Sequence, residues 1–388
     1  MIDGGAAAYL QQAHRNNWQQ YLSSLRPGAR HGWDLCVLTA GDERQASMYR
    51  RQLDWRREAG LLPARTQFLV LPDPDGRRIG SGGATLRALQ RVSTFERLNV
   101  ERASLSRILI IHAGGDSRRL PHCSAIGRLF ARVPRELPDG RASTIFDEFL
   151  ISLSGLEEGA PPGVLIAAGD ILLVFDHLQL RGAFRRSGVT GVAAAALAEL
   201  GTHHSVYASG GESGRAVYAY LHKPTLAELA QASAISSDGT VQIDTGLVWL
   251  DAPTVGKLME LAQTFATIGV IGDNPNVPCL ERPNVNGCDF PTSLNLYGDL
   301  LLPLAASTTF ASYLSDASDG PARRKCKSLG GSSGSDCAAP LLPSNACNPP
   351  LSLTSAPPRS IGAWRPVIPT LRGCAAGVYR AKSRLDRS

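Results

Sequence analysis

A short loop at residues 112–119 carries groups that suit a polyanion. It has the sequence HAGGDSRR and directly follows an apolar run. Two glycines let the backbone amides approach a phosphate closely, while a hydroxyl and two guanidinium groups supply hydrogen-bond donors and positive charge. These groups are Gly114, Gly115, Ser117, Arg118 and Arg119. The pattern predicts a binding site for a nucleoside triphosphate, and the alternative is a surface turn that bears two solvated arginines.

Two common nucleotide-binding motifs do not describe this loop. It lacks the three spaced glycines of the dinucleotide fingerprint, and it lacks the Gly-Lys-Ser/Thr ending of a P-loop. A simple dehydrogenase and a P-loop kinase are therefore disfavoured. Nucleotidyl transfer fits better, because it needs backbone amides, basic side chains and a divalent metal to hold two polyanions together.

Asp170 is the best candidate for binding that metal. It ends the segment VLIAAGD, in which an apolar strand is followed by a glycine and then a carboxylate. A carboxylate just beyond a buried strand is well placed to hold Mg²⁺ between phosphate oxygens. The alternative is an ordinary helix N-cap.

A second glycine-rich stretch lies at residues 80–85, with the sequence GSGGAT. Its small residues precede an expected helix, so Gly82 and Gly83 are candidates for contact with a phosphate or a base. The alternative is a tight turn that lets the helix pack closely against the sheet.

The elements that must position these residues alternate between strands and helices. Strands are expected at 33–39, 67–71, 107–111, 164–168, 189–197, 215–221 and 244–250, and helices at 6–25, 43–59 and 84–91. This order predicts an α/β fold with a doubly wound, mostly parallel sheet and with ligands above the carboxyl ends of the strands. We expect a helical extension at 1–30, one large domain at 31–320 and a tail at 321–388.

The charge distribution sets the tail apart from the rest of the chain. The formal net charge is +6, but residues 321–388 hold 11 Lys/Arg against 2 Asp/Glu, which leaves 29 against 32 in residues 1–320. The net charge therefore gives no reason to expect nucleic-acid binding. The tail is rich in Ser, Gly and Pro without a sustained apolar period, so disorder is expected there.

The cysteines and histidines do not form a metal-binding pattern. None of the 8 cysteines lies in a C-x-x-C pair, so zinc is not expected, and free thiols favour the cytoplasm. We expect adjacent His203 and His204 to face opposite sides of a strand, and His112 to support its loop. No apolar run is long enough to span a membrane. The sequence does not indicate an oligomeric state.

Three segments resemble a known family. HAGGDSRRLPHCSAIGRLF is similar to the first signature of the sugar-1-phosphate nucleotidyltransferases, in the variant of the fucose-1-phosphate guanylyltransferases. The segments at 33–63 and 71–89 are similar to those that precede this loop in the guanylyltransferase half of bifunctional fucokinase/GDP-fucose pyrophosphorylases. The resemblance covers roughly residues 30–315, with the motifs in the same order. It implies the Rossmann-like fold of this family.

The resemblance also implies roles for individual residues. Arg118 or Arg119 would lie against the β- and γ-phosphates. Arg128 stands where the family usually has lysine, or is a solvated helix residue. Lys223, in LHKP, corresponds to the lysine of the second signature, which contacts the sugar phosphate. Asp244, in IDTGLVWL, would be a second metal ligand or a sugar-hydroxyl acceptor.

Asp299 also lies in a segment that matches the family, LNLYGDLLLPLA. It is another candidate carboxylate, or else a helix cap.

The implied activity is the formation of GDP-L-fucose and pyrophosphate from GTP and β-L-fucose 1-phosphate, with Mg²⁺ as cofactor. The partners would be these two substrates, without nucleic acid or a membrane. Two alternatives stay open. One is a truncated member of the bifunctional enzymes, and the other is a nucleotide-sugar binding protein without turnover. The latter would bind GTP without releasing pyrophosphate.

Overall fold

Apolar side chains on both faces of several strands place these strands in the centre of the protein. In the computed structural model, β1 (Leu35–Ala40) is buried along its whole length, and β3 (Arg107–His112) and β6 (Gly163–Ala168) are buried except at their ends. Strands that are apolar on both faces are typical of parallel sheets covered by helices. The structure describes residues 4–98, 106–114, 123, 127–210, 216–267, 269, 271–272, 284–285, 288–289 and 293–302.

The central sheet has eight strands in the order β2-β1-β3-β6-β10-β8-β9, and β7 pairs with the other edge of β10. The five strands not yet given are β2 (Gln67–Pro72), β7 (Val189–Leu197), β8 (Ser205–Gly210), β9 (Ala216–His222) and β10 (Thr240–Asp251). Neighbours from β2 to β6 are parallel, whereas β10 is antiparallel to β6, β7 and β8, and β9 is antiparallel to β8. Six strands therefore run in one direction, which confirms the mostly parallel sheet.

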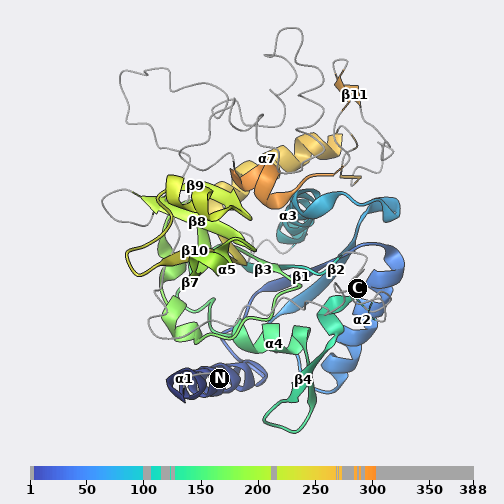
Figure 1. The fold of residues 1–388 in the computed structure, drawn as a ribbon. Helices are drawn as coiled ribbons and strands as arrows, with labels where there is room; N and C mark the ends of the chain where they lie inside the picture. The colour runs from blue at the N-terminus through green and yellow to red at the C-terminus, as the bar shows by residue number, and fades with distance from the viewer. Residues whose placement is uncertain are drawn as a thin grey trace, which may run out of the picture.

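Helices cover both faces of this sheet (Figure 1). One face packs against α1 (Gly4–Ser24), α2 (Glu43–Glu58) and α4 (Ile145–Ser152). The other face packs against α3 (Gly80–Leu98), α7 (Ala252–Thr267) and the π-helix η6 (Leu296–Leu301). Successive strand residues alternate between the two cores, because side chains of a strand point to opposite faces. The α/β architecture is thus a three-layer arrangement of helices, sheet and helices.

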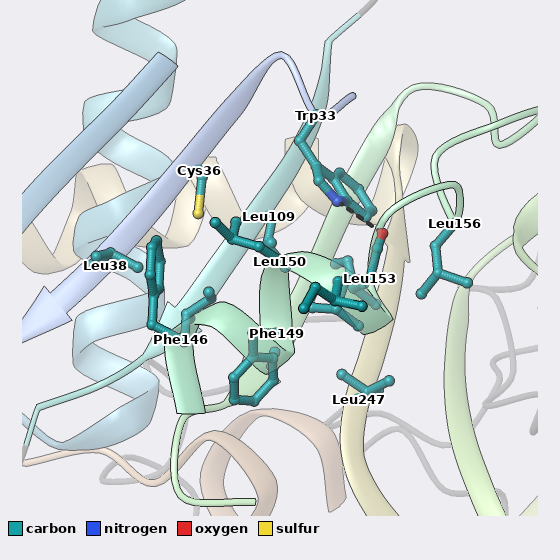
Figure 2. Packing of buried hydrophobic residues seen from close by; sticks show 14 of the residues in the cluster. Trp33, Cys36, Leu38, Leu109, Phe146, Phe149, Leu150, Leu153, Leu156 and Leu247 are labelled. Atoms are coloured by element: carbon teal, nitrogen blue, oxygen red, sulfur yellow. Dashed lines mark hydrogen bonds between the residues drawn. The ribbon is translucent and has the colours of Figure 1, made fainter. Parts of the chain in front are cut away.

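The core between α4 and the sheet shows how this alternation works (Figure 2). Cys36 and Leu38 of β1 and Leu109 of β3 point toward Phe146 and its neighbours on α4. At the far end of the cluster, the indole of the buried Trp33 donates a hydrogen bond of 3.3 Å to the carbonyl of Leu153.

The remaining elements surround this framework. A two-stranded hairpin, β4 and β5, precedes α4, and a second short pair is formed by β11 and β12. The bounds are β4 Arg132–Glu136, β5 Ala142–Thr144, β11 Asn284–Val285, β12 Cys288–Asp289, α5 Ala198–Gly201, α6 Leu226–Gln231, η1 Pro74–Gly76, η3 Arg128–Phe130, η4 His177–Leu180 and η5 Ala183–Arg185.

The structure agrees with the sequence on most elements and corrects two of them. The expected helix before the first strand is present as α1, and its Trp18 and Tyr21 are buried in the core. The glycine-rich stretch is the first turn of α3, because the helix begins at Gly80 and not at residue 84. His203 and His204 lie in the turn before β8, so they do not occupy a strand. The tail at 321–388 lies outside the described residues.

Within the described part of the chain, no helix combines the length and the apolar composition needed to cross a bilayer.

Candidate active site

The loops after β1, β3 and β6 meet at the carboxyl edge of the sheet. The amide of Gly169 donates a hydrogen bond of 3.0 Å to the carbonyl of His112. A Cβ atom on Gly169 would lie 2.7 Å from that oxygen, and one on Gly114 would lie 3.2 Å from the backbone of Ala40 and Gly41. The three backbones approach so closely that side chains do not fit between them. These contacts bring two candidate site residues, Gly114 and Asp170, to the same edge of the sheet.

Arg128 and Asp170 form an ion pair at this edge. Their side chains are 28% and 33% exposed, and the Nη1 atom of Arg128 lies 3.3 Å from Oδ2 of Asp170. Asp170 lies two residues beyond the end of β6, and Arg128 begins η3. Both side chains therefore remain accessible to a ligand, and a cation stands beside the predicted metal ligand. The N-cap alternative for Asp170 has no support, because no helix begins there.

A tyrosine from α2 sets the position of Arg128. The hydroxyl of Tyr49 donates a hydrogen bond of 2.7 Å to the carbonyl of Ala113. Gly127 has a φ of 69°, and a Cβ atom there would overlap the ring of Tyr49. The buried phenol therefore fixes the distance between the loop after β3 and the turn that presents Arg128.

Part of the predicted phosphate-binding loop lies outside the described residues. This part includes Gly115, Ser117, Arg118 and Arg119. Their roles stay predictions. Of this loop, the structure describes residues 112–114.

The glycine-rich first turn of α3 packs against a segment from much later in the chain. The amide of Gly82 donates a hydrogen bond of 2.8 Å to the carbonyl of Leu294. A Cβ atom on Gly80 would lie 2.2 Å from that same oxygen, and one on Gly83 would lie 3.0 Å from the side chain of Ile79. These residues form the first helical turn of α3 and not a separate tight turn, and their small size lets α3 pack closely against the segment before η6. Contact of Gly82 and Gly83 with a nucleotide stays a prediction.

Asp244 is surrounded by phenol groups that the sequence did not reveal as partners. It accepts hydrogen bonds from the hydroxyls of Tyr207 at 2.9 Å and Tyr220 at 3.1 Å, and from the amide of Gly246 at 2.8 Å. Tyr297 of η6 also donates to this carboxylate. Burial raises the pKa of Asp244, and the hydrogen bonds oppose the shift. In the sequence, the expected strand at 215–221 placed Tyr220 on a strand, but nothing indicated that Tyr207 would also contact Asp244.

The β8–β9 hairpin brings Lys223 toward the same edge. β10 pairs with β6 through Leu247–Asp251 and with β8 through residues 242–243, while β7 occupies its other edge. The hairpin therefore continues beyond the carboxyl end of β6. Lys223 follows β9 at the near end of this hairpin, is exposed, has a φ of 48° and donates its amide to the carbonyl of His204 at 3.0 Å.

Asp299 has a structural role in η6. Its carboxylate accepts a hydrogen bond of 2.7 Å from the amide of Asn295, the residue that precedes this helix. Asp299 is only 4% exposed. The helix-cap interpretation therefore describes it better than that of a ligand-binding carboxylate.

One protein family and several curated proteins are similar to this chain in sequence. The family model for the fucose pyrophosphorylase domain matches residues 101–329. A bifunctional fucokinase/GDP-fucose pyrophosphorylase of Arabidopsis thaliana is 30% identical over 278 residues, which are 62% of this chain and 26% of that protein. A fucose-1-phosphate guanylyltransferase of Mus musculus is 31% identical over 217 residues, which are 52% of this chain and 35% of that protein. The chain thus spans about a third or less of these relatives.

Among solved structures, HddC from Yersinia pseudotuberculosis in complex with GMP-PN covers 70% of this chain and 85% of its own, with 8% identity and a TM-score of 0.29. A score this low carries no weight in the assignment. The family match includes β3 with its loop, Arg128, Asp170, Lys223 and Asp244. The chain belongs to the fucose pyrophosphorylase family.

Proposed function

We propose that this chain is a fucose-1-phosphate guanylyltransferase, which converts GTP and β-L-fucose 1-phosphate to GDP-L-fucose and pyrophosphate. The observation that carries the proposal is the Arg128–Asp170 pair beside the loop after β3, at the carboxyl edge of a mostly parallel sheet. Ligands of open α/β sheets bind at this edge. The names of the relatives supply the sugar and the nucleotide.

The reaction transfers the guanylyl group in one displacement. An oxygen of the sugar phosphate attacks the α-phosphorus of GTP, a new P–O bond forms, and the bond to the β-phosphate breaks as pyrophosphate leaves. The protein has to place two polyanions in line and compensate for charge on the leaving group. We assign Arg118, Arg119 and Ser117 to the triphosphate and Lys223 to the sugar phosphate. Arg128 supplies a further cation on the side of Asp170.

Asp170 fits the binding of Mg²⁺. Among the described residues, no three His, Cys, Asp or Glu side chains gather in one place. Magnesium sites of nucleotide enzymes typically use one or two carboxylates together with substrate phosphates and water, so a single accessible carboxylate is sufficient. When bound, the ion would neutralise phosphate charge and polarise the α-phosphate. Arg128 would then exchange its contact with Asp170 for a contact with phosphate oxygens.

Asp244 suits the sugar better than the metal. Its oxygens already accept hydrogen bonds from tyrosine hydroxyls and a backbone amide. A metal ion would have to displace these donors, whereas a sugar hydroxyl can join such a network as a further donor. We therefore assign Asp244 and its tyrosines to the sugar side of the site.

Two finer assignments belong to the same proposal. The sheet is of the Rossmann-like type of sugar nucleotidyltransferases, supported by the parallel order β2-β1-β3-β6. The cytoplasm is the expected compartment, supported by the free thiols of Cys36 and Cys123 among the described residues.

The test is to incubate the purified chain with each nucleoside triphosphate, a panel of sugar 1-phosphates and Mg²⁺, and to measure pyrophosphate release. We expect release only when GTP and fucose 1-phosphate are both present. Release with a different pair would change the substrate assignment. Binding of GTP with no release for any pair would show a binding protein and would overturn the proposed activity.

A further inference from the structure

The side chain of His112 contacts a buried threonine of α3. Nε2 of His112 lies 2.9 Å from Oγ1 of Thr85, and that hydroxyl donates a hydrogen bond of 2.9 Å to the carbonyl of Ser81. Thr85 has no exposed surface. A threonine hydroxyl has only one proton, so both contacts are hydrogen bonds only when His112 is the donor in the first. Satisfying both contacts therefore assigns the ring proton of His112 to Nε2.

The environment of His112 keeps this ring neutral. Burial lowers the pKa of His112 to about 4. A neutral ring with its proton on Nε2 leaves Nδ1 as an acceptor. The ring thus has one fixed donor, directed at α3, at the point where β3 gives way to the predicted phosphate-binding loop.

The backbone of the same residue holds the opposite side of the site. The carbonyl of His112 accepts the amide of Gly169 at 3.0 Å, and Asp170 follows Gly169 directly. His112 therefore joins three parts of the site. These are α3 through its side chain, Gly169 before the predicted metal ligand through its carbonyl, and the predicted phosphate-binding loop through the chain itself.

The network continues from α3 to the late segment of the chain. The hydroxyl of Ser81 accepts a hydrogen bond of 2.9 Å from the amide of Leu296. Leu296 begins η6, whose Tyr297 donates to Asp244. The segment at the start of η6 thus holds the first turn of α3 from the opposite side, independently of His112.

We propose that His112 and Thr85 are a positioning pair for guanylyl transfer, in which the Nε2–H of His112 donates to Thr85 and fixes residues 112–114, where the predicted phosphate-binding loop begins, relative to α3 and Asp170. This inference rests on the proposed function for its kinetic consequence. Its structural part, the tautomer of His112, does not depend on the reaction. The two parts can therefore fail separately.

The first experiment measures the tautomer in the wild-type protein. Nitrogen NMR of protein labelled with ¹⁵N-histidine distinguishes protonated from unprotonated ring nitrogens, and the signals of His112 are those that disappear in His112→Gln. At neutral pH we expect Nε2 to carry the proton and Nδ1 to be unprotonated. A proton on Nδ1, or a doubly protonated ring, would overturn the proposal whether or not the protein is a transferase.

The second experiment compares variants that keep or remove this one hydrogen bond. Thr85→Val removes the hydroxyl at nearly constant volume, and Thr85→Ser keeps it. His112→Gln keeps an N–H near the position of Nε2, whereas His112→Asn does not reach Thr85. Thr190→Val is the matched control, because Thr190 is equally buried on β7 and its hydroxyl has no hydrogen-bond partner among the described residues.

We expect Thr85→Val and His112→Asn to lower kcat/KM for GTP by roughly tenfold, as for the loss of one buried hydrogen bond, with KM for fucose 1-phosphate within about twofold of wild type. The Ser and Gln variants should restore most of the rate. The double variant should be no slower than either single one, since both remove the same contact. Equal losses for both substrates, or a similar loss in Thr190→Val, would show general loosening and overturn the positioning role.

Discussion

The guanidinium of Arg128 lies 3.3 Å from the carboxylate of Asp170, although 42 positions separate the two residues in the chain. Asp170 is held at the end of β6 by the bond between Gly169 and His112, and Arg128 is held by the contact of Gly127 with Tyr49. The two charges therefore meet because the framework places them together.

Asp170→Asn should abolish transfer while leaving the protein folded. The amide keeps the shape of the side chain but lacks the negative charge that holds Mg²⁺. We expect kcat to fall by at least about a hundredfold, with an unchanged far-ultraviolet circular dichroism spectrum. Initial rates should be measured up to saturating Mg²⁺. Wild-type activity under those conditions would show that Asp170 does not bind the metal.

Gly127→Ala should displace Arg128, and Gly140→Ala is its matched control. Both glycines have a positive φ, 69° and 82°, so strain of the backbone should cost about 1 kcal/mol of stability in both variants. Only at Gly127 would the new methyl group overlap Tyr49, since nothing lies within 4 Å of a Cβ atom on Gly140. We expect kcat to fall roughly tenfold or more in Gly127→Ala alone, because misplacing a catalytic group by about 1 Å is costly. Equal rates in the two variants would contradict the role of the Tyr49 contact.

Arg119→Ala and Lys223→Ala should impair different substrates. Loss of Arg119 should raise KM for GTP and lower kcat, because charge on the departing pyrophosphate is no longer compensated. Loss of Lys223 should raise KM for fucose 1-phosphate more than KM for GTP. Each effect should amount to about 1.5–3 kcal/mol, the range for one charge-assisted hydrogen bond. Both constants should be measured for both variants, and the reverse pattern would exchange the two assignments.

Asp73 should make stability depend on pH. It follows β2, its side chain is 13% exposed, and burial raises its pKa to about 7 despite Arg78 nearby. Because the folded pKa is the higher one, the stabilising contribution of its proton is complete below the unfolded value of about 4 and is lost as pH rises to about 7. Asp73→Asn should therefore reduce the loss of stability between pH 5 and 8 by up to about 3 kcal/mol, since each pH unit between 5 and the folded pKa contributes about 1.4 kcal/mol.

Urea unfolding of both proteins at pH 5 and pH 8 checks this prediction. Other buried carboxylates, such as Glu148 and Glu157, also have a raised pKa and contribute in the same direction. The difference between variant and wild type isolates Asp73 from this background. An identical dependence on pH in the two proteins would contradict the raised pKa of Asp73.

The sequence predicts the parallel half of the sheet well, because its strands are short apolar runs that end in glycine or carboxylate. β1, β3 and β6 are found within one or two residues of their expected bounds. The strands of the antiparallel half were harder to predict from the sequence. β8 has the polar sequence SVYASG, and its conformation comes from pairing with β9 and β10, which local sequence does not show.

The candidate site divides in the same way. The positions of Gly114 and Asp170 at the carboxyl edge of the sheet could be predicted, because each lies two residues beyond an apolar strand. The donors to Asp244 could not be predicted, since Tyr207 is 37 positions and Tyr220 24 positions away in the chain. Likewise, the sequence did not show that the glycines at the start of α3 pack closely against Leu294. These contacts join segments that lie far apart in the chain, so local sequence does not reveal them.

The contact between the first turn of α3 and the segment before η6 also affects how the protein is made. Ser81 and Leu296, which bond to each other, lie 215 positions apart. At a synthesis rate of about 5–20 residues per second, the ribosome needs roughly 10–40 s to add the later residue after the earlier one. During this time the start of α3 lacks its native partner, and a hydrophobic face remains exposed. The nascent chain should therefore be a client of ribosome-associated chaperones until residue 302 has left the exit tunnel.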